Sequence, residues 1–248
     1  MSPAAGSRLR LVSVYPELLG TYGDAGNVTV LERRARLRGI ECEVVTVRAL
    51  TPVPDSGDVY VLGGGEDLAQ TSATRALSVD GGLRRAVRAG AAVFAVCAGL
   101  QMLGEEFPDP SGRAVHGLGL LDVVSTRLPR RAVGEIATAT ADGLVLSGFE
   151  NHGSGTQLGP DAAPLGHVLA GIGNGTAEAS EGARQDRIVA TYLHGPALAR
   201  NPDLADLVLS SVVGDLPPLP DPLAEALREE RLTALLGRRR TRRLRATG

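Results

Sequence analysis

The sequence predicts an α/β fold with a mostly parallel β-sheet, because short apolar strands alternate with helical segments along its first half. Four apolar runs have the length of buried strands, at 9–15, 42–47, 58–62 and 91–96. Helical patterns at about 27–37 and 73–88 separate them, as the crossovers of a parallel sheet require. After Phe107 come short, glycine-rich β segments, at 119–124, 133–140 and 144–150. These indicate antiparallel additions to the sheet.

Local signals set the ends of these elements. Pro16 ends the first strand, and a glycine-rich turn over 19–27 follows it. Asn27 is a suitable N-cap for the first helix, and Gly39 a suitable stop. In the second half, 187–193 reads as another apolar strand, and helical patterns return at 203–212 and 221–236. We therefore predict a domain over residues 1–215, a helical extension over 216–237 and a disordered arginine-rich tail over 238–248.

Composition limits the chemistry of the chain. All 26 cationic residues are arginine, which excludes a P-loop lysine, a Schiff-base lysine and pyridoxal phosphate chemistry in this chain. Two cysteines cannot form a disulfide framework, and no apolar stretch approaches the roughly 18 residues of a membrane span. The N-terminus does not read as a secretory signal. We therefore expect a cytoplasmic protein that binds no nucleic acid and has no membrane span.

Cys97 stands where a catalytic nucleophile is typically found. The apolar run Ala91–Val96 ends at this residue, and a segment that can open a helix follows at once. A strand that turns sharply into a helix forms a nucleophile elbow, which exposes the turn residue beside a helix N-terminus. Ala95 departs from the usual glycine of such elbows. A buried structural cysteine is the alternative, because free cysteines are among the most buried residues.

Two further strand ends carry groups suited to the same site. Gly63, Gly64 and Gly65 follow the strand at 58–62, where backbone N–H groups could form an oxyanion hole or an ordinary tight turn. His194 follows the strand at 187–193 and precedes Gly195-Pro196, a context suited to a catalytic base. The four histidines lack the spacing of a zinc site, so we predict no metal.

Five segments taken together resemble class I glutamine amidotransferases of the cobyric-acid-synthase-like branch. In chain order they are VLGGGEDLAQ, AVCAGLQMLGEEF, GLGLLDVVSTR, GFENHGSGTQ and ATYLHGP. With VYPELLGTYGDAGN near the N-terminus, the chain looks most similar to the GatD family of glutaminase subunits of lipid II isoglutaminyl synthases. The resemblance covers about residues 9–210. It implies a three-layer sandwich around the mostly parallel sheet.

The resemblance also implies roles for individual residues. Cys97 would attack the carboxamide of L-glutamine and His194 would act as its base. The N–H groups of Ala98 and Gly64 would hold the oxyanion. Arg131 best matches the arginine that binds glutamine in GatD proteins, ahead of Arg127 and Arg130. Contacts with the substrate are further implied for Gln101, Asn151 and His152, although Gln101 could equally be a helix-surface residue and His152 an alternative base.

The same resemblance implies a heterodimer. A MurT-like Mur ligase subunit would use ATP and Mg²⁺ to activate the D-glutamate of the lipid II stem peptide, and ammonia from this chain would convert it to D-isoglutamine. No cofactor is expected in this chain itself. Through this complex, the chain could lie at the inner face of the membrane. The alternatives are a cobalamin-pathway amidotransferase, a related cysteine amidase or peptidase, and a non-catalytic binding module.

One position departs from the wider class. Many triad amidotransferases place a glutamate two residues after the histidine, where this chain has Pro196. A histidine without an orienting acid is a poorer base. We therefore expect either a dyad or an acid supplied from elsewhere, and we favour the partner subunit as its source.

Overall fold

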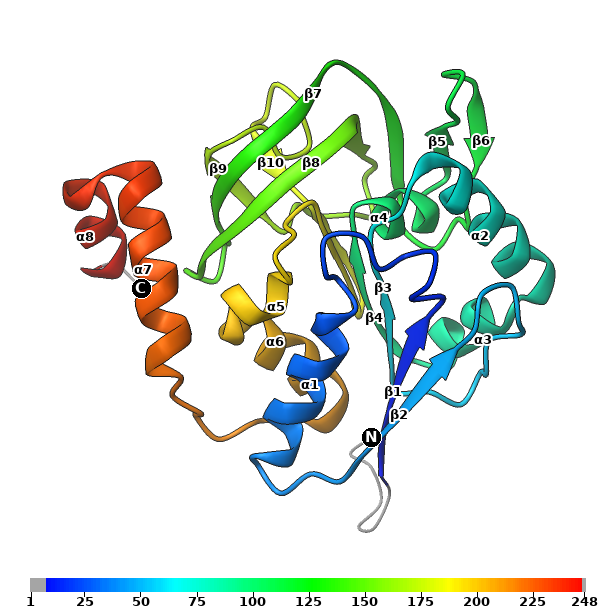
Figure 1. Cartoon of the computed structure of the whole chain (residues 1–248), viewed down its shortest axis with the longest axis horizontal. Coiled ribbons are helices and arrows are strands. Elements are labelled where there is room, and N and C mark those ends of the chain that lie inside the picture. Colours follow the sequence, from blue (N-terminus) through cyan, green and yellow to red (C-terminus); the bar gives the residue numbers. More distant parts are fainter. Residues whose placement is uncertain (1–7, 247–248) are drawn as a thin grey trace.

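The computed structural model describes residues 8–246, with the side chains of 242, 243, 245 and 246 left undescribed (Figure 1). Its centre is a six-stranded sheet in the order β11-β12-β4-β3-β1-β2. Every neighbouring pair is parallel except β11–β12. The strands are β1 (Leu9–Val14), β2 (Cys42–Val47), β3 (Val59–Leu62), β4 (Ala92–Val96), β11 (Ala183–Gln185) and β12 (Ile188–Thr191).

Helices cover both faces of this sheet and complete the expected three-layer sandwich (Figure 1). On one face lie α1 (Gly26–Arg36), α5 (Ala197–Arg200) and α6 (Pro202–Val213). On the other lie α2 (Asp67–Asp80), α3 (Gly82–Arg88) and α4 (Ala98–Leu103). The single helix predicted over 73–88 is in fact α2 and α3. They separate at Gly81, whose φ of 67° is left-handed and ends α2.

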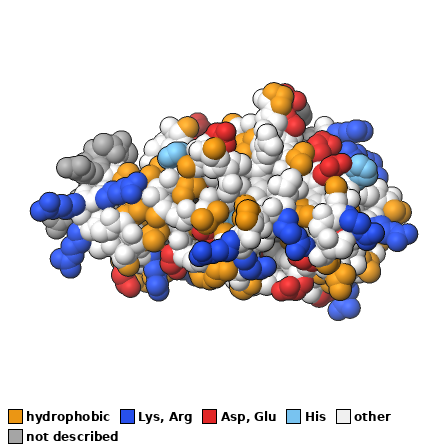
Figure 2. Space-filling view, turned by 90° about the horizontal axis from the view of Figure 1, so that it is seen from above, with side chains coloured by type: hydrophobic (Ala, Val, Ile, Leu, Met, Phe, Trp, Pro, Cys, Tyr) orange, Lys and Arg blue, Asp and Glu red, His pale blue; other side chains and the backbone are white. Residues whose placement is uncertain are grey.

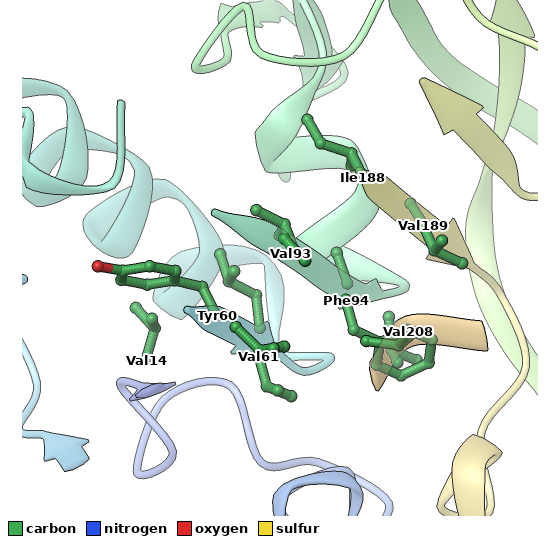
Figure 3. Packing of buried hydrophobic residues seen from close by; sticks show 14 of the residues in the cluster. Val14, Tyr60, Val61, Val93, Phe94, Ile188, Val189 and Val208 are labelled. Atoms are coloured by element: carbon green, nitrogen blue, oxygen red, sulfur yellow. The ribbon is translucent and has the colours of Figure 1, made fainter. Parts of the chain in front are cut away.

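The core forms where the sheet packs against these helices (Figure 3). All five residues of β4 and all four of β3 are buried, as expected for strands covered on both faces. Phe94 of β4 and Val208 of α6 belong to the same buried cluster. The apolar runs that predicted these strands are thus the residues that fill the interior.

A second, mostly antiparallel sheet lies above the carboxyl ends of the central strands (Figure 1). Its order is β10-β9-β7-β5-β6, and β8 pairs with β7. The strands are β5 (Glu106–Pro108), β6 (Ala114–His116), β7 (Val123–Ala139), β8 (Val145–Leu158), β9 (Gly166–Ala170) and β10 (Ser180–Glu181). The predicted antiparallel strands therefore form a sheet of their own. Only β11 is an antiparallel addition to the central sheet.

The C-terminal segment forms two helices, α7 (Pro222–Leu236) and α8 (Arg238–Ala246). The tail was expected to be disordered, but it is helical over its described residues. Thr241 is buried and its hydroxyl bonds to the carbonyl of Gly237, which fixes the start of α8. Blue side chains gather at the left end of Figure 2, where α7 and α8 lie in Figure 1.

Two smaller observations complete the fold. Asn27 was predicted to cap α1, but Ala25 takes the cap position. Asn27 is buried inside the helix, where its Oδ1 accepts a hydrogen bond from the N–H of Leu198 (2.9 Å), and it therefore joins α1 to α5. Over residues 8–246, no helix has the length and apolarity needed to cross a bilayer.

Candidate active site

The predicted functional groups meet because four neighbouring strands end at one edge of the central sheet. His194 follows β12, Cys97 follows β4, Gly64 follows β3, and the turn with Asp24 follows β1. These strands are adjacent and parallel, so their carboxyl ends meet. Gly64, Cys97 and His194 line one cavity, and Asp24 is buried against His194.

Cys97 occupies a strained turn between β4 and α4. Its φ of 54° and ψ of −104° lie outside the regions favoured by residues with a side chain. Its N–H donates to the carbonyl of Thr191 (2.8 Å), which ties the turn to the end of β12. Cys97 is 9% exposed and lines the cavity. This is the geometry of a nucleophile elbow, with Cys97 as the N-cap residue of α4.

His194 is held in place from two sides. Its backbone exchanges two hydrogen bonds with Phe149 of β8 (2.8 and 3.1 Å), so the second sheet fixes its position. Its Nδ1 lies 2.9 Å from Oδ2 of Asp24, and both side chains are almost wholly buried. The Nε2 atom is buried and makes no hydrogen bond of ordinary geometry with the described residues. It is therefore the nitrogen left to exchange protons at the sulfur.

The electrostatics of this pair favour a charged imidazole. Burial lowers the pKa of His194, but interactions with Asp24 and Cys97 outweigh burial and raise the pKa to about 9. An imidazolium beside a thiol stabilises the thiolate, which is the nucleophilic form of cysteine. The three residues thus form a Cys–His–Asp arrangement.

The source of the acid differs from our expectation. We favoured the partner subunit, yet Asp24 of this chain occupies the position beside His194. The turn LGTYGDAGN could have indicated this acid, because it contains Asp24 and follows the carboxyl end of a predicted strand. The order of the strands, which puts β1 two places from β4, was needed to recognise it.

Gly64 lies close to the side chains of His194, Asp24 and Cys97. A Cβ atom added there would lie 2.8 Å from Cε1 of His194 and 3.1 Å from Oδ2 of Asp24, so only glycine fits. Its N–H donates to Oδ2 of Asp24 (2.8 Å). The predicted role of Gly64 as an oxyanion donor is therefore replaced by a role in orienting Asp24, because the hydrogen of this amide is already engaged.

Arg131 lines the same cavity, beside Asn151. The register of β7 against β8 shifts between Arg127 and Ala132, and Arg131 belongs to this irregular segment. Bulges of this kind re-aim side chains next to active sites. Arg131 donates to Asn151 through Nε to Oδ1 (2.6 Å) and through Nη2 to the backbone carbonyl (3.2 Å). Arg127 also lines the cavity.

The other predicted residues, Ala98, Gln101 and His152, also line the cavity. Ala98 is the first residue of α4, so its N–H has no partner within the helix. Gln101 is buried rather than on the helix surface, and its amide joins Gln70 (3.0 Å) and Tyr192 (3.3 Å). His152 is buried with its ring stacked on Tyr192 at 3.8 Å.

Tyr22 and Gln70 were not predicted, although both line the cavity. Tyr22 contacts the ring of His194 and Asn151, while Gln70 comes from α2. Their positions depend on how loops and helices pack, which no short motif records. Among the described residues, no group of three or more histidine, cysteine, aspartate or glutamate side chains is placed to hold a metal ion.

Comparisons with known proteins find glutamine amidotransferases. The profile of the CobB/CobQ-like glutamine amidotransferase domain matches residues 10–202. The GatD subunit of glutamine-hydrolysing lipid II isoglutaminyl synthase from Staphylococcus aureus (strain N315) is 35% identical over 193 residues, which are 77% of this chain and 79% of that protein. The subunit of the same name from Streptococcus pneumoniae (strain ATCC BAA-255 / R6) is 30% identical over 238 residues and 90% of each chain.

Likenesses over a smaller part of the chain, or in structure alone, point the same way. Cobyric acid synthase from Methylobacterium nodulans is 38% identical over 160 residues, which are 61% of this chain but 32% of that enzyme. A crystal structure of a glutamine amidotransferase superposes with a TM-score of 0.56 at 19% identity, covering 81% of this chain and 97% of that one, which supports the fold alone. The chain therefore belongs to the family of CobB/CobQ-like glutamine amidotransferases and is an enzyme of that class.

Proposed function

We propose that this chain is the glutaminase subunit of a lipid II isoglutaminyl synthase. The observation that carries the glutaminase part is the meeting of Cys97, His194 and Arg131 around one cavity. The lipid II part is supported by the two GatD relatives, which match this chain over 79% and 90% of their own length. Cobyric acid synthases match over about a third of theirs, so they support a second candidate, an amidotransferase acting in cobalamin synthesis.

In the proposed reaction, the Cys97 thiolate attacks the side-chain carboxamide carbon of L-glutamine. The C–N bond of the resulting tetrahedral intermediate breaks, and His194 gives its proton to the leaving ammonia. A thioester remains on the sulfur. Water then attacks the thioester, His194 accepts a proton from that water, and glutamate leaves as the Cys97 sulfur is released.

Backbone amides would stabilise the oxyanion of both tetrahedral intermediates. The N–H of Ala98 is proposed as one donor, because the first amide of a helix points away from the helix body. The N–H of Gly64 is engaged by Asp24, so we assign the second donor to the next amide of the loop, that of Gly65, which lines the cavity.

The remaining residues would hold the amino-acid end of the substrate. Arg131 is proposed to bind the α-carboxylate, because a guanidinium pairs with a carboxylate through two parallel hydrogen bonds. Asn151 holds Arg131 in place. Gln101 and His152 would line the side-chain slot, with Gln101 oriented by Gln70 and Tyr192.

The ammonia would pass to a Mur-ligase-like partner that activates the acceptor carboxylate of lipid II with ATP and Mg²⁺. This places the cofactors on the partner and none in this chain. The complex would act in the cytoplasm at the membrane face where lipid II is available. The names of the two GatD relatives support a subunit that acts with a partner on lipid II. The nature of the partner and its cofactors are proposed from the motifs that the chain shares with the GatD family.

The test is amidation of lipid II by this chain co-expressed with the candidate ligase, with glutamine or ammonium chloride as nitrogen source. The wild-type complex should use both. The Cys97→Ala complex should use ammonium alone, because only the glutaminase step needs the sulfur. Glutamine-dependent amidation by Cys97→Ala, or amidation of a corrinoid acid instead of lipid II, would contradict the proposal.

A further inference from the structure

Tyr22 lies on the turn that carries Asp24, and the mechanism above gives it no role. Tyr22 and Gly23 are both left-handed, with φ of 60° and 80°. The turn is tied to the glycine loop by a hydrogen bond from the N–H of Thr21 to the carbonyl of Gly64 (3.1 Å). A left-handed conformation is uncommon for a bulky residue and tends to persist where the surroundings impose it. Here the turn buries Asp24 and presents Tyr22 to the cavity.

The ring of Tyr22 covers His194. The two ring centroids are 4.9 Å apart and the ring planes meet at 64°, an edge-to-face contact. Tyr22 is 45% exposed, while His194 is 1% exposed. Tyr22 is therefore the outer member of the pair, and its ring separates the imidazole from solvent on that side.

The hydroxyl of Tyr22 is bonded to Asn151 of β8, a strand of the second sheet. It accepts a hydrogen bond from Nδ2 of Asn151 (2.5 Å), while Oδ1 of Asn151 accepts one from Nε of Arg131 (2.6 Å). The direction of this chain is fixed, because arginine has donors only and must face the amide oxygen. A continuous path therefore runs from Arg131 through Asn151 and Tyr22 to the imidazole.

We propose that Tyr22 is a positioning residue that couples the carboxylate subsite at Arg131 to the base at His194. This inference rests on the proposed glutaminase function. Arg131 uses two of its N–H donors on Asn151, which leaves others for the α-carboxylate of glutamine. A bound carboxylate holds Arg131, Asn151 and Tyr22 in line and keeps the ring against His194. A carboxamide without an α-carboxylate does not bind Arg131 and therefore does not hold Asn151 and Tyr22 in line.

The test compares two reagents that alkylate Cys97 in the full-length chain. A diazoketone analogue of glutamine carries the α-carboxylate, whereas iodoacetamide does not, and peptide mapping separates Cys97 from Cys42. The Tyr22→Phe variant keeps the ring and loses the hydroxyl. Its half-saturating concentration for the glutamine analogue should rise about 3- to 10-fold, the effect of losing one hydrogen bond. Its rate with iodoacetamide should not change.

Matched variants complete the design. Tyr60→Phe removes a tyrosine hydroxyl that bonds to Pro54, at the far end of the sheet, and should alter neither reaction. In an Arg131→Ala background, Tyr22→Phe should add nothing, because both changes break the same path. Asn151→Ala breaks the path between Arg131 and Tyr22. If Tyr22→Phe fails to fold, Asn151→Ala serves in its place and should give the result expected for Tyr22→Phe.

The outcomes are distinct. An equal effect of Tyr22→Phe on both reagents would show a general structural role, and no effect on either would show that the path carries no coupling. Either result overturns the inference while the glutaminase proposal stands. Wild-type protein that reacts with iodoacetamide but shows no saturable reaction with the glutamine analogue would overturn the proposed function, and the coupling with it.

Discussion

One carboxylate oxygen of Asp24 makes two contacts. Its Oδ2 accepts from the N–H of Gly64 and lies against Nδ1 of His194, while its Oδ1 is buried without a hydrogen-bond partner among the described residues. The aspartate is thus positioned by the glycine loop and in turn orients the imidazole. A buried acid in this position selects the histidine tautomer and stabilises the imidazolium.

The variant Asp24→Asn should therefore lower the glutaminase kcat by about 10²- to 10⁴-fold, with a smaller change in KM, because the amide keeps the shape but loses the charge. Ammonia release by the complex measures this. The matched control is Asp58→Asn, which removes a carboxylate that accepts from the N–H of Arg10 outside the site. Full activity of Asp24→Asn would contradict the role of Asp24 and would favour an acid supplied by the partner subunit.

His194 should also make the stability of the chain depend on pH. Its pKa is raised from 6.5 to about 9 in the folded state. A raised folded pKa stabilises the fold fully below about pH 6.5, and this contribution is lost as the pH rises through about 9. Wild-type protein should therefore lose free energy of unfolding between pH 6.5 and 9 relative to His194→Gln, as measured by urea unfolding. Parallel curves for the two proteins over this range would contradict the assignment.

At the scale of secondary-structure elements, the loop between β3 and α2 brings Gly64 close to the side chains that follow β1 and β12. Gly64 has no room for a side chain beside His194 and Asp24. Gly64→Ala should push the imidazole away from Cys97 and lower the glutaminase kcat by at least about 10²-fold, the scale of a misplacement of about 1 Å.

The control for this variant is Gly153→Ala in β8, on the same cavity. Outside the neighbouring residues, the nearest atom to an added Cβ there would be Nη1 of Arg131 at 3.9 Å, an ordinary contact distance. Gly153→Ala should keep most of the activity, and both variants should keep a cooperative unfolding transition. Equal losses of kcat in Gly64→Ala and Gly153→Ala would show that an added methyl group is harmful at either place in the cavity. The close contacts of Gly64 would then not explain its effect.

Local patterns predicted elements well and contacts between distant elements poorly. The strand at Cys42–Val47 and the turn at Cys97 were both foreseen, because apolar runs and glycine positions act over a few residues. Asp24 and His194, by contrast, are 170 positions apart and meet only through the strand order. The link from Arg131 to Asn151 likewise depends on the bulge in β7. Pro129 marks an irregularity there, but the sequence does not say which residue Arg131 meets across it.

Across the whole molecule, Arg34 of α1 joins the first and last parts of the chain. It pairs with Asp206 of α6 through two hydrogen bonds of 2.7 Å and also donates to the carbonyl of Leu219 (3.1 Å). The Arg34 side chain is 5% exposed, and Asp206 also accepts from Arg38 (2.6 Å). This cluster fastens the segment leading to α7 onto the central domain.

Arg34→Ala should lower the free energy of unfolding by about 3 kcal/mol, because it leaves Asp206 with one fewer buried partner. The control is Arg36→Ala, which breaks a pair with Glu32 on the same helix but at an exposed position, and should cost less than about 1 kcal/mol. Denaturant titration compares the two. Similar costs would mean that the cluster adds no more than a surface ion pair.

The most direct test of the catalytic account is detection of the covalent intermediate. The complex is mixed with glutamine, quenched in acid within milliseconds, digested and examined by mass spectrometry. We predict a γ-glutamyl thioester on the peptide that contains Cys97, and more of it in Asp24→Asn if that variant slows hydrolysis more than attack. Ammonia released at the normal rate by Cys97→Ala, or an acyl group found on another residue, would contradict it.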